Sequence, residues 1–213
     1  MDSNQDQGGR VVSLIPKQLA DLKCRATMGR PYADRISLML ASRLLDKSDR
    51  YFDPFAVLDE LDHLEGMRAS SVTKRESQFK LGGPLHPLWH KHFTLPRHLI
   101  HNIGIRWNLS GGGNKDLDNM IEEVLREHGE FPERWQALLT HRFVIDAFKD
   151  RAARGLTGDW IIYGKHDDLN YYLDLATHSE AVGQKAVQLL KKLRGSCMAE
   201  FPFVFAEQEA RSA

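Results

Sequence analysis

The sequence predicts an α+β fold in which a mostly helical N-terminal two thirds precedes a small antiparallel sheet. Two patterns carry this prediction. Apolar residues recur at three- and four-residue spacing before residue 155, which is typical of amphipathic helices. Aromatic and β-branched residues then fill two short runs, 160–163 and 171–173, which is typical of strands. The 213 residues, 42% of them hydrophobic, can bury a core without disulfide bonds.

Three short helices are expected in the N-terminal part. Their predicted spans are residues 16–27, 32–47 and 53–66. Asp53 can cap the third helix, and Pro54 fits its first turn, where a missing N–H group leaves no hydrogen bond unmade. Residues 67–78 are small, polar and charged without periodicity, so we expect a linker there. The predicted domains are a disordered tail over 1–15, a helical subdomain over 16–66 and an α+β domain over 79–213.

The C-terminal part is expected to combine helices with a hairpin. Residues 79–107 are rich in Pro, His and aromatic side chains, and we expect irregular structure that becomes helical at Pro96. Further helices are predicted over 114–128, 131–153 and 179–194, and a hairpin over 159–178. Residues 200–205 are predicted to form an edge strand, because Pro202 cannot donate a hydrogen bond to a ladder.

The predicted hairpin has two unlike faces. A turn centred on Asp168 and Leu169 pairs residues whose numbers sum to 337. The core face then carries Trp160, Ile162, Leu173 and Leu175. The polar face carries Tyr163, Lys165, Tyr172 and Asp174, with His178 at its end. A cation, phenols, a carboxylate and an imidazole are groups that metal-independent RNA cleavage uses. The alternative is that this face is exposed, or covered by another element, without a chemical role.

A histidine-rich basic segment precedes the hairpin. Five of the ten histidines are His86, His90, His92, His98 and His101. Residues 71–110 carry six Lys or Arg against one acid, whereas residues 53–66 hold five acids and no Lys or Arg, and residues 111–134 hold seven acids against three bases. The formal net charge of zero therefore results because a positively charged segment and two negatively charged segments cancel. Aromatic residues interleave with the basic ones, as phosphate contact and base stacking require, although each aromatic can equally belong to the core.

The histidines also allow a metal-binding interpretation. His86 and His90 stand four residues apart and, with His92, could bind zinc. No HExxH motif and no nearby Cys accompanies them, so we expect no resident cofactor.

Composition limits the cellular setting. No apolar run approaches the roughly 20 residues of a membrane helix, and the N-terminus lacks the basic and apolar segments of a secretory signal. The two cysteines, Cys24 and Cys197, are far apart in the sequence. We therefore expect a cytoplasmic protein with reduced thiols and without membrane contact.

Two stretches of the chain carry a resemblance to known proteins. Residues 88–93, Leu-Trp-His-Lys-His-Phe, and residues 157–178 look like a group of uncharacterised bacterial proteins. More remotely, helices followed by a small antiparallel sheet with His, Lys and Tyr on one face resemble ribonuclease toxins of the barnase, EndoU, colicin and RelE class. That resemblance covers at most residues 80–205 and rests on architecture and residue types. It implies an RNA-cleaving activity and assigns no residue.

These observations favour a bacterial protein that binds or cleaves RNA, a nuclease working by acid–base catalysis without a metal. The predicted catalytic residues are His90, His92, Lys165 and His178. The predicted substrate-binding residues are Trp89, Lys91, Arg97, His101, Tyr163, Tyr172 and Asp174. One alternative is a non-enzymatic module that binds a protein partner or a second copy of itself through its opposite charges, and another is a zinc enzyme. The nuclease hypothesis requires the basic segment to pack beside the polar hairpin face.

Overall fold

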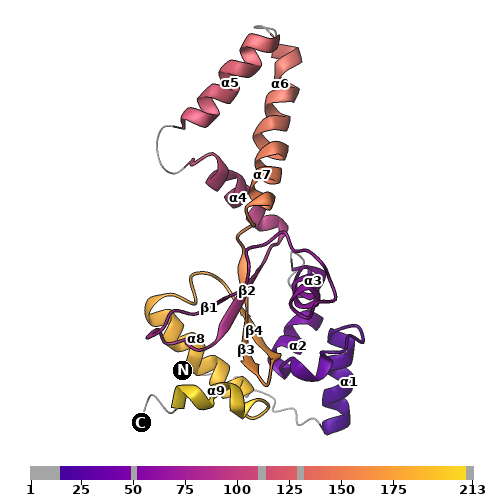
Figure 1. Ribbon diagram of the computed structural model, residues 1–213. Helices are drawn as coiled ribbons and strands as arrows, with labels where there is room; N and C mark the ends of the chain where they lie inside the picture. The colour runs from indigo at the N-terminus through magenta and orange to yellow at the C-terminus, as the bar shows by residue number, and fades with distance from the viewer. Residues whose placement is uncertain (1–14, 49–51, 110–113, 129–131, 210–213) are drawn as a thin grey trace, which may run out of the picture.

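A four-stranded antiparallel sheet forms the centre of the fold, with helices on both faces and a helical arm at one end (Figure 1). The computed structural model describes residues 15–48, 52–109, 114–128 and 132–209. The predicted α+β class is confirmed. The predicted tail, apart from Ile15, lies outside the described residues.

Three N-terminal helices cover one face of the sheet (Figure 1). They are α1 (Pro16–Ala26), α2 (Leu38–Leu45) and α3 (Pro54–Leu64). The cap of α3 is as predicted, because Asp53 accepts a hydrogen bond from the Phe55 amide at 2.9 Å. The second helix begins later than predicted. The 3₁₀ turn η1 (Ala33–Arg35) precedes it, and the Ser37 hydroxyl caps it by accepting from the Leu40 amide.

The helical arm connects β2 to β3 and extends away from the sheet (Figure 1). It consists of η2 (Pro96–His98), α4 (Leu99–Arg106), α5 (Lys115–His128), α6 (Pro132–His141), the π-helical turn η3 (Arg142–Asp146) and α7 (Ala147–Ala153). The helix predicted over 131–153 is thus present with a π turn inside it. The arm has its own small core, in which Trp107 stacks on Phe143 and donates its indole N–H to the Phe143 carbonyl oxygen at 2.8 Å.

The strands follow the order β1-β2-β3-β4. Their bounds are β1 (Ser77–Gln78), β2 (Trp89–Phe93), β3 (Asp159–His166) and β4 (Leu169–Ala176). The β3–β4 hairpin is confirmed, but its predicted register is wrong. Asp167 and Asp168 form a two-residue turn with φ angles of 48° and 59°, as in a type I′ hairpin. This tight turn places Tyr163 opposite Tyr172 instead of Asp174. A bulge at Leu173 in β4 then shifts the pairing by one residue, so that Ile162 lies opposite Asp174.

Two further strand predictions are wrong. Residues 89–93, expected to be irregular, form β2 in the interior of the sheet. Residues 202–209 form helix α9 (Pro202–Glu209) instead of an edge strand, because Pro202 also fits the first turn of a helix. This helix packs on β3 at Gly164, where a Cβ atom would lie 2.2 Å from Val204 Cγ1. Any larger residue at that position would have to displace the Val204 side chain of α9.

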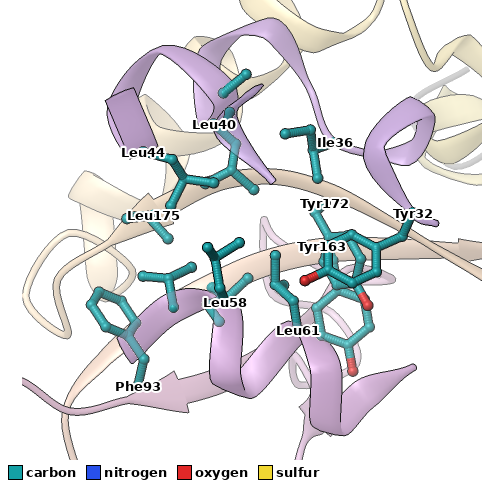
Figure 2. Close-up of a cluster of buried hydrophobic side chains, with 14 of the residues drawn as sticks. Tyr32, Ile36, Leu40, Leu44, Leu58, Leu61, Phe93, Tyr163, Tyr172 and Leu175 are labelled. Carbon is teal, nitrogen blue, oxygen red and sulfur yellow. The ribbon is translucent and has the colours of Figure 1, made fainter. Parts of the chain in front are cut away.

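Each face of the sheet has its own hydrophobic core. Figure 2 shows the first core, where side chains of α2 and α3 pack on Phe93, Tyr163, Tyr172 and Leu175 of the strands. The second core lies between the other face and the pair α8 (Gly183–Cys197) and α9, with Trp160, Ile162 and Leu173 from the sheet. Leu175, predicted to share a face with Trp160, belongs to the first core because of the changed register.

The predicted division into two domains at 67–78 stays a prediction, although segments on both sides of it contribute to the first core. Among the helices of the described ranges, none combines the length and the apolar character that crossing a bilayer requires.

Candidate functional site

Three of the predicted catalytic histidines meet on the α8 side of the sheet, around Trp160. The ring of Trp160 lies 4.3 Å from that of His90, 5.8 Å from that of His92 and 4.4 Å from that of His178, measured between centroids. His92 lies 5.9 Å from His90 and stacks on His178 at 6.4 Å. We call these four residues the histidine cluster. The histidines of the basic segment therefore lie beside His178 at the end of the hairpin, but on the side of Trp160 and not on the predicted polar face.

Strand pairing produces this cluster. In β2, alternation directs Trp89, Lys91 and Phe93 toward α1–α3 and the two histidines toward the opposite side. His92 pairs with Trp160 in the neighbouring strand β3. His178 follows β4 by two residues and reaches the same end of the sheet.

Burial keeps two of the histidines neutral. It lowers the pKa of His90 to about 4, with further lowering by His92 and His178. It lowers the pKa of His92 to about 4 against the opposing effect of a hydrogen bond to Gly158. The Nδ1 atom of His92 lies 3.2 Å from the carbonyl oxygen and 3.3 Å from the amide nitrogen of Gly158, which fixes the ring. Both imidazoles are therefore uncharged at neutral pH.

Two polar atoms of the cluster are buried without a hydrogen-bond partner among the residues that the structure describes. They are Nδ1 of His90 and Nε1 of Trp160. His90 has one polar contact, with its Nε2 atom 3.2 Å from the Ser77 hydroxyl. Buried polar atoms without partners are uncommon, and they cluster at functional positions or beside bound water.

A cleft of about 940 Å³ adjoins the cluster. It lies between the start of the arm, the chain entering β3 and the start of α8. Its walls are formed by His98, His101, Thr157, Gly158, Asp159, His178, Ser179, Val182, Gln184 and Lys185. His178 belongs to both the cluster and the cleft, and Gly158 connects the cleft to His92. The volume is within the range of about 300–1,000 Å³ that small-molecule sites occupy.

Some charged groups of the cleft are engaged with each other. Asp159 binds Arg97 at 2.6 Å and lies 3.5 Å from Nε2 of His98. The other ring nitrogen of His98 accepts a hydrogen bond from the Leu95 amide at 2.9 Å. Burial lowers the pKa of His98, although Asp159 acts in the opposite direction.

Three exposed side chains of the cleft have free donor groups. His101, His178 and Lys185 make no hydrogen bond or ion pair with any other residue of the described ranges. They come from α4, from the loop after β4 and from α8. The cleft therefore presents imidazoles and an ammonium group to a ligand from different elements.

The polar hairpin face predicted from the sequence is not a surface. Tyr163, Tyr172 and Asp174 are fully buried and do not face solvent in this arrangement. Their predicted binding of substrate stays a prediction. Burial raises the pKa of both tyrosines, and for Tyr172 a hydrogen bond to Glu65 acts in the same direction. The changed register also separates Asp174 from the tyrosines. Its carboxylate lies 2.9 Å from Nζ of Lys192 in α8.

Lys165 and Trp89 lie away from the histidine cluster. The ammonium group of Lys165 is 4.0 Å from the ring centroid of Trp89 and 6.0 Å from that of Tyr163, both on the α1–α3 side. Lys165 is near the hairpin turn, at the opposite end of β3 from Trp160. The structure therefore does not bring this predicted catalytic lysine to the histidines.

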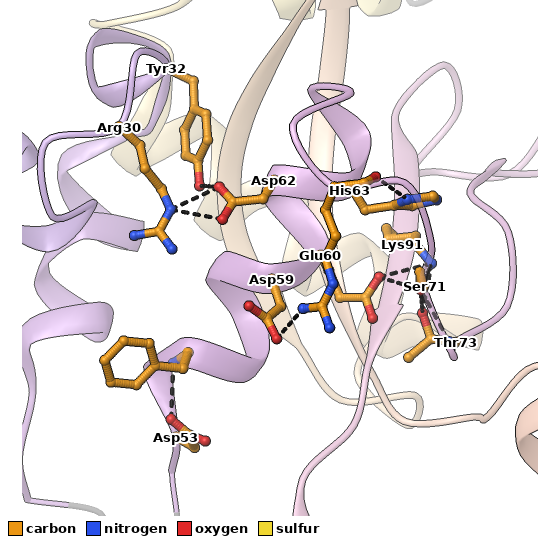
Figure 3. Close-up of polar contacts among 12 residues, drawn as sticks. Arg30, Tyr32, Asp53, Asp59, Glu60, Asp62, His63, Ser71, Thr73 and Lys91 are labelled. Carbon is orange, nitrogen blue, oxygen red and sulfur yellow. Dashed lines mark hydrogen bonds and ion pairs between the residues drawn. The ribbon is translucent and has the colours of Figure 1, made fainter.

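Lys91 is the centre of a buried polar network (Figure 3). Its Nζ atom lies 3.0 Å from Glu60 and donates to the Ser71 hydroxyl at 3.0 Å, the Thr73 hydroxyl at 2.6 Å and the Lys74 carbonyl oxygen at 2.7 Å. All its donors are used inside the protein. Lys91 therefore has no donor left for a substrate in this arrangement, and its predicted substrate contact stays a prediction.

Opposite charges from different segments pair within the chain. On α3, Asp62 binds Arg30 and Glu60 binds Lys91. In the arm, Arg106 binds Asp150 at 2.9 Å. The positive sum over residues 71–110 therefore does not become a basic surface of the same size.

No group of three or more His, Cys, Asp or Glu side chains in the described part of the chain is arranged to hold a metal ion. Zinc binding by His86, His90 and His92 stays a prediction. The sequence reasoning missed Gln184 and Lys185. No local signal distinguishes Lys185, because α8 also carries Lys191 and Lys192.

No protein-family model matches this chain, and comparisons with curated proteins and with solved structures give no match. The resemblance to ribonuclease toxins therefore stays a prediction. The site must be interpreted from its own geometry.

Proposed function

We propose that this protein cleaves RNA by acid–base chemistry at the cleft beside the histidine cluster. The observation that carries the proposal is the position of His178, which is in the cluster and also in the cleft wall. His101 lines the same cleft from a different element. Two exposed imidazoles around one cavity can serve as a proton acceptor and a proton donor.

The reaction requires one proton acceptor and one proton donor. The acceptor removes the proton of a ribose 2′-hydroxyl, whose oxygen attacks phosphorus and forms a 2′,3′-cyclic phosphate. The donor protonates the 5′-oxygen of the departing nucleotide, so that no charge accumulates on it. We assign these two roles to His178 and His101 as a pair.

His92 is a positioning residue in this proposal. It is buried and neutral, its Nδ1 atom is fixed by Gly158, and its ring stacks on His178. Replacing it with Gln removes the stacking surface and leaves the cleft residues in place. We expect the pH profile of cleavage to shift in the His92→Gln variant, which a purely structural role would not cause.

The test is cleavage of a mixed-sequence RNA by purified protein in the presence of EDTA. His178→Ala and His101→Ala should each reduce the rate by about 10²-fold or more, as expected for loss of a general acid or base. His141→Ala is the matched control, since His141 is an exposed histidine of the arm outside the cleft. Absence of cleavage by the wild-type protein, or full activity in both cleft variants, would overturn the proposal.

A binding module without catalysis is the second candidate. The pairing of acidic and basic segments inside the chain favours it, because these ion pairs account for the charge pattern without a polyanionic substrate. The same RNA assay separates the candidates. RNA that is cut would support the nuclease, whereas RNA that is neither retained in a gel shift nor cut would support a module that binds a protein partner.

A further inference from the structure

Lys185 has a different environment from its neighbouring lysines in α8. It lies in the first turn of the helix, is exposed and lines the cleft. Lys192 is bound to Asp174 at 2.9 Å, and Lys191 does not line the cleft. Because of its position in the helix, Lys185 is therefore the lysine of these three that is available to a ligand in the cleft.

We propose that the α8 wall of the cleft is a phosphate-binding subsite, where Lys185 and Gln184 hold the phosphate group of a nucleotide. The inference rests on the proposed function and names a part of the site that the sequence did not predict. The ammonium group neutralises the phosphate, and the amide of Gln184 donates a further hydrogen bond. His178 and His101 then face the ester oxygens from the adjoining walls.

The electrostatic balance of the cleft supports an anionic ligand. Asp159 is the one carboxylate among the cleft-lining residues, and it is already bound to Arg97. Within the described ranges, no carboxylate lies within ion-pair distance of Lys185. An exposed cation without a counter-ion in a concave site attracts an anion more strongly than the same cation on an open surface.

This subsite also supplies the cation that the reaction requires. The sequence assigned that role to Lys165, which lies over the Trp89 ring near the hairpin turn. Lys185 lines the same cleft as His178 and His101. It is therefore placed to stabilise the charge that develops on phosphorus oxygens during transfer.

Calorimetric titration of the full-length protein with 3′-AMP tests the subsite without any turnover. Adenosine tests the contribution of the base alone, and inorganic phosphate tests the phosphate alone. We expect 3′-AMP to bind more tightly than adenosine, and Lys185→Ala to weaken 3′-AMP binding about tenfold, because one charge-assisted hydrogen bond changes Kd by about that factor. Lys191→Ala, an exposed lysine of the same helix, should leave binding unchanged. Lys185→Arg should retain most of the affinity.

The outcomes separate this inference from the proposed function. Phosphate-dependent binding that Lys185→Ala weakens, in a protein that does not cut RNA, would support the subsite and overturn the nuclease. Cleavage with the same KM in the wild-type protein and in Lys185→Ala would overturn the subsite and retain the nuclease. Equal binding of 3′-AMP and adenosine, or no binding of 3′-AMP, would also overturn it. Thermal unfolding of each variant checks that folding is intact.

Discussion

The two faces of the central sheet both carry polar side chains, but they use them in different ways. On the α1–α3 face, Lys91 is saturated by partners inside the protein, and Tyr172 donates its hydroxyl proton to Glu65 at 2.6 Å. On the α8 face, Nδ1 of His90 and Nε1 of Trp160 have no hydrogen-bond partner among the described residues, and His178 reaches the cleft. The first face joins helices to the sheet, whereas the second continues to a solvent-accessible cavity.

The covering helices cause this difference. Residues of α2 and α3 extend across the first face, and their apolar side chains bury the two tyrosines (Figure 2). On the second face, α8 begins only at Gly183, five residues after His178, and the arm starts nearby. The sheet end at His178 is therefore not covered by α8, and the cleft lies there. A polar residue on a strand is therefore accessible only where the covering element ends.

On the α1–α3 face, we expect the largest loss of stability from a substitution of Lys91. Lys91→Met leaves the Glu60 carboxylate buried without its counter-ion, and we expect a loss of about 3 kcal/mol in the free energy of unfolding. Urea denaturation measures it. The double variant Lys91→Met with Glu60→Leu should recover much of that stability, because no uncompensated charge remains. A loss below about 1 kcal/mol in the single variant would show that the Lys91–Glu60 pair contributes no more than a weak surface ion pair.

Gly158 provides a test of the α8 face. A Cβ atom at this position would lie 1.9 Å from the Phe93 carbonyl oxygen, so Gly158→Ala must displace backbone. We expect destabilisation of about 3 kcal/mol and a shifted His92 ring, visible in the NMR resonances of His92 and His178. Gly104→Ala in α4 is the control, because nothing lies within 4 Å of its Cβ position. Unchanged stability in Gly158→Ala would contradict the close approach of residue 158 to the Phe93 carbonyl group at the end of β2.

The histidines of the α8 face should make stability depend on pH. The pKa values of His90 and His92 are about 4 in the folded protein and about 6.5 in the unfolded chain, so the unfolded state binds more protons between these values. The free energy of unfolding should therefore fall as the pH decreases from 6.5 and level off below about pH 4. The total loss should be roughly 2 kcal/mol, a value that is reduced because solvent partly screens the two rings.

Urea titrations between pH 4 and 7 measure this slope. His90→Gln and His92→Gln should each flatten it, whereas the exposed His141→Gln should not. Parallel slopes in all the variants would show that other groups dominate acid unfolding.

The smallest effect is expected at Lys165. Its ammonium group contacts the face of Trp89 on the α1–α3 side, which contributes about 0.5–1 kcal/mol at an exposed site. Lys165→Ala should reduce stability by no more than that and leave RNA cleavage unchanged. A strong loss of cleavage with normal stability would support the catalytic role that the sequence predicted for Lys165. It would also contradict the functional difference between the two faces of the sheet.

Local chemistry explains which parts of the fold were predictable. The cap at Asp53, the helix after Asn114 and the hairpin depend on residues close together in the sequence, and all three are present. Strand β2 was missed because Trp-His-Lys-His-Phe does not alternate between apolar and charged residues. The predicted hairpin register was wrong because the turn is tighter than expected, which changed the partner of every side chain near it, and because a bulge in β4 shifts the pairing farther from the turn.

Sequence patterns were sufficient to predict the α+β class and to select His90, His92, His101 and His178 as candidate site residues. Only the tertiary structure decided that these histidines meet, because His92 and Trp160 become neighbours through strand pairing across the whole arm. It also decided that Lys185 rather than Lys165 lines the cleft. Periodicity and capping act over a few residues, whereas exposure depends on where distant helices begin and end.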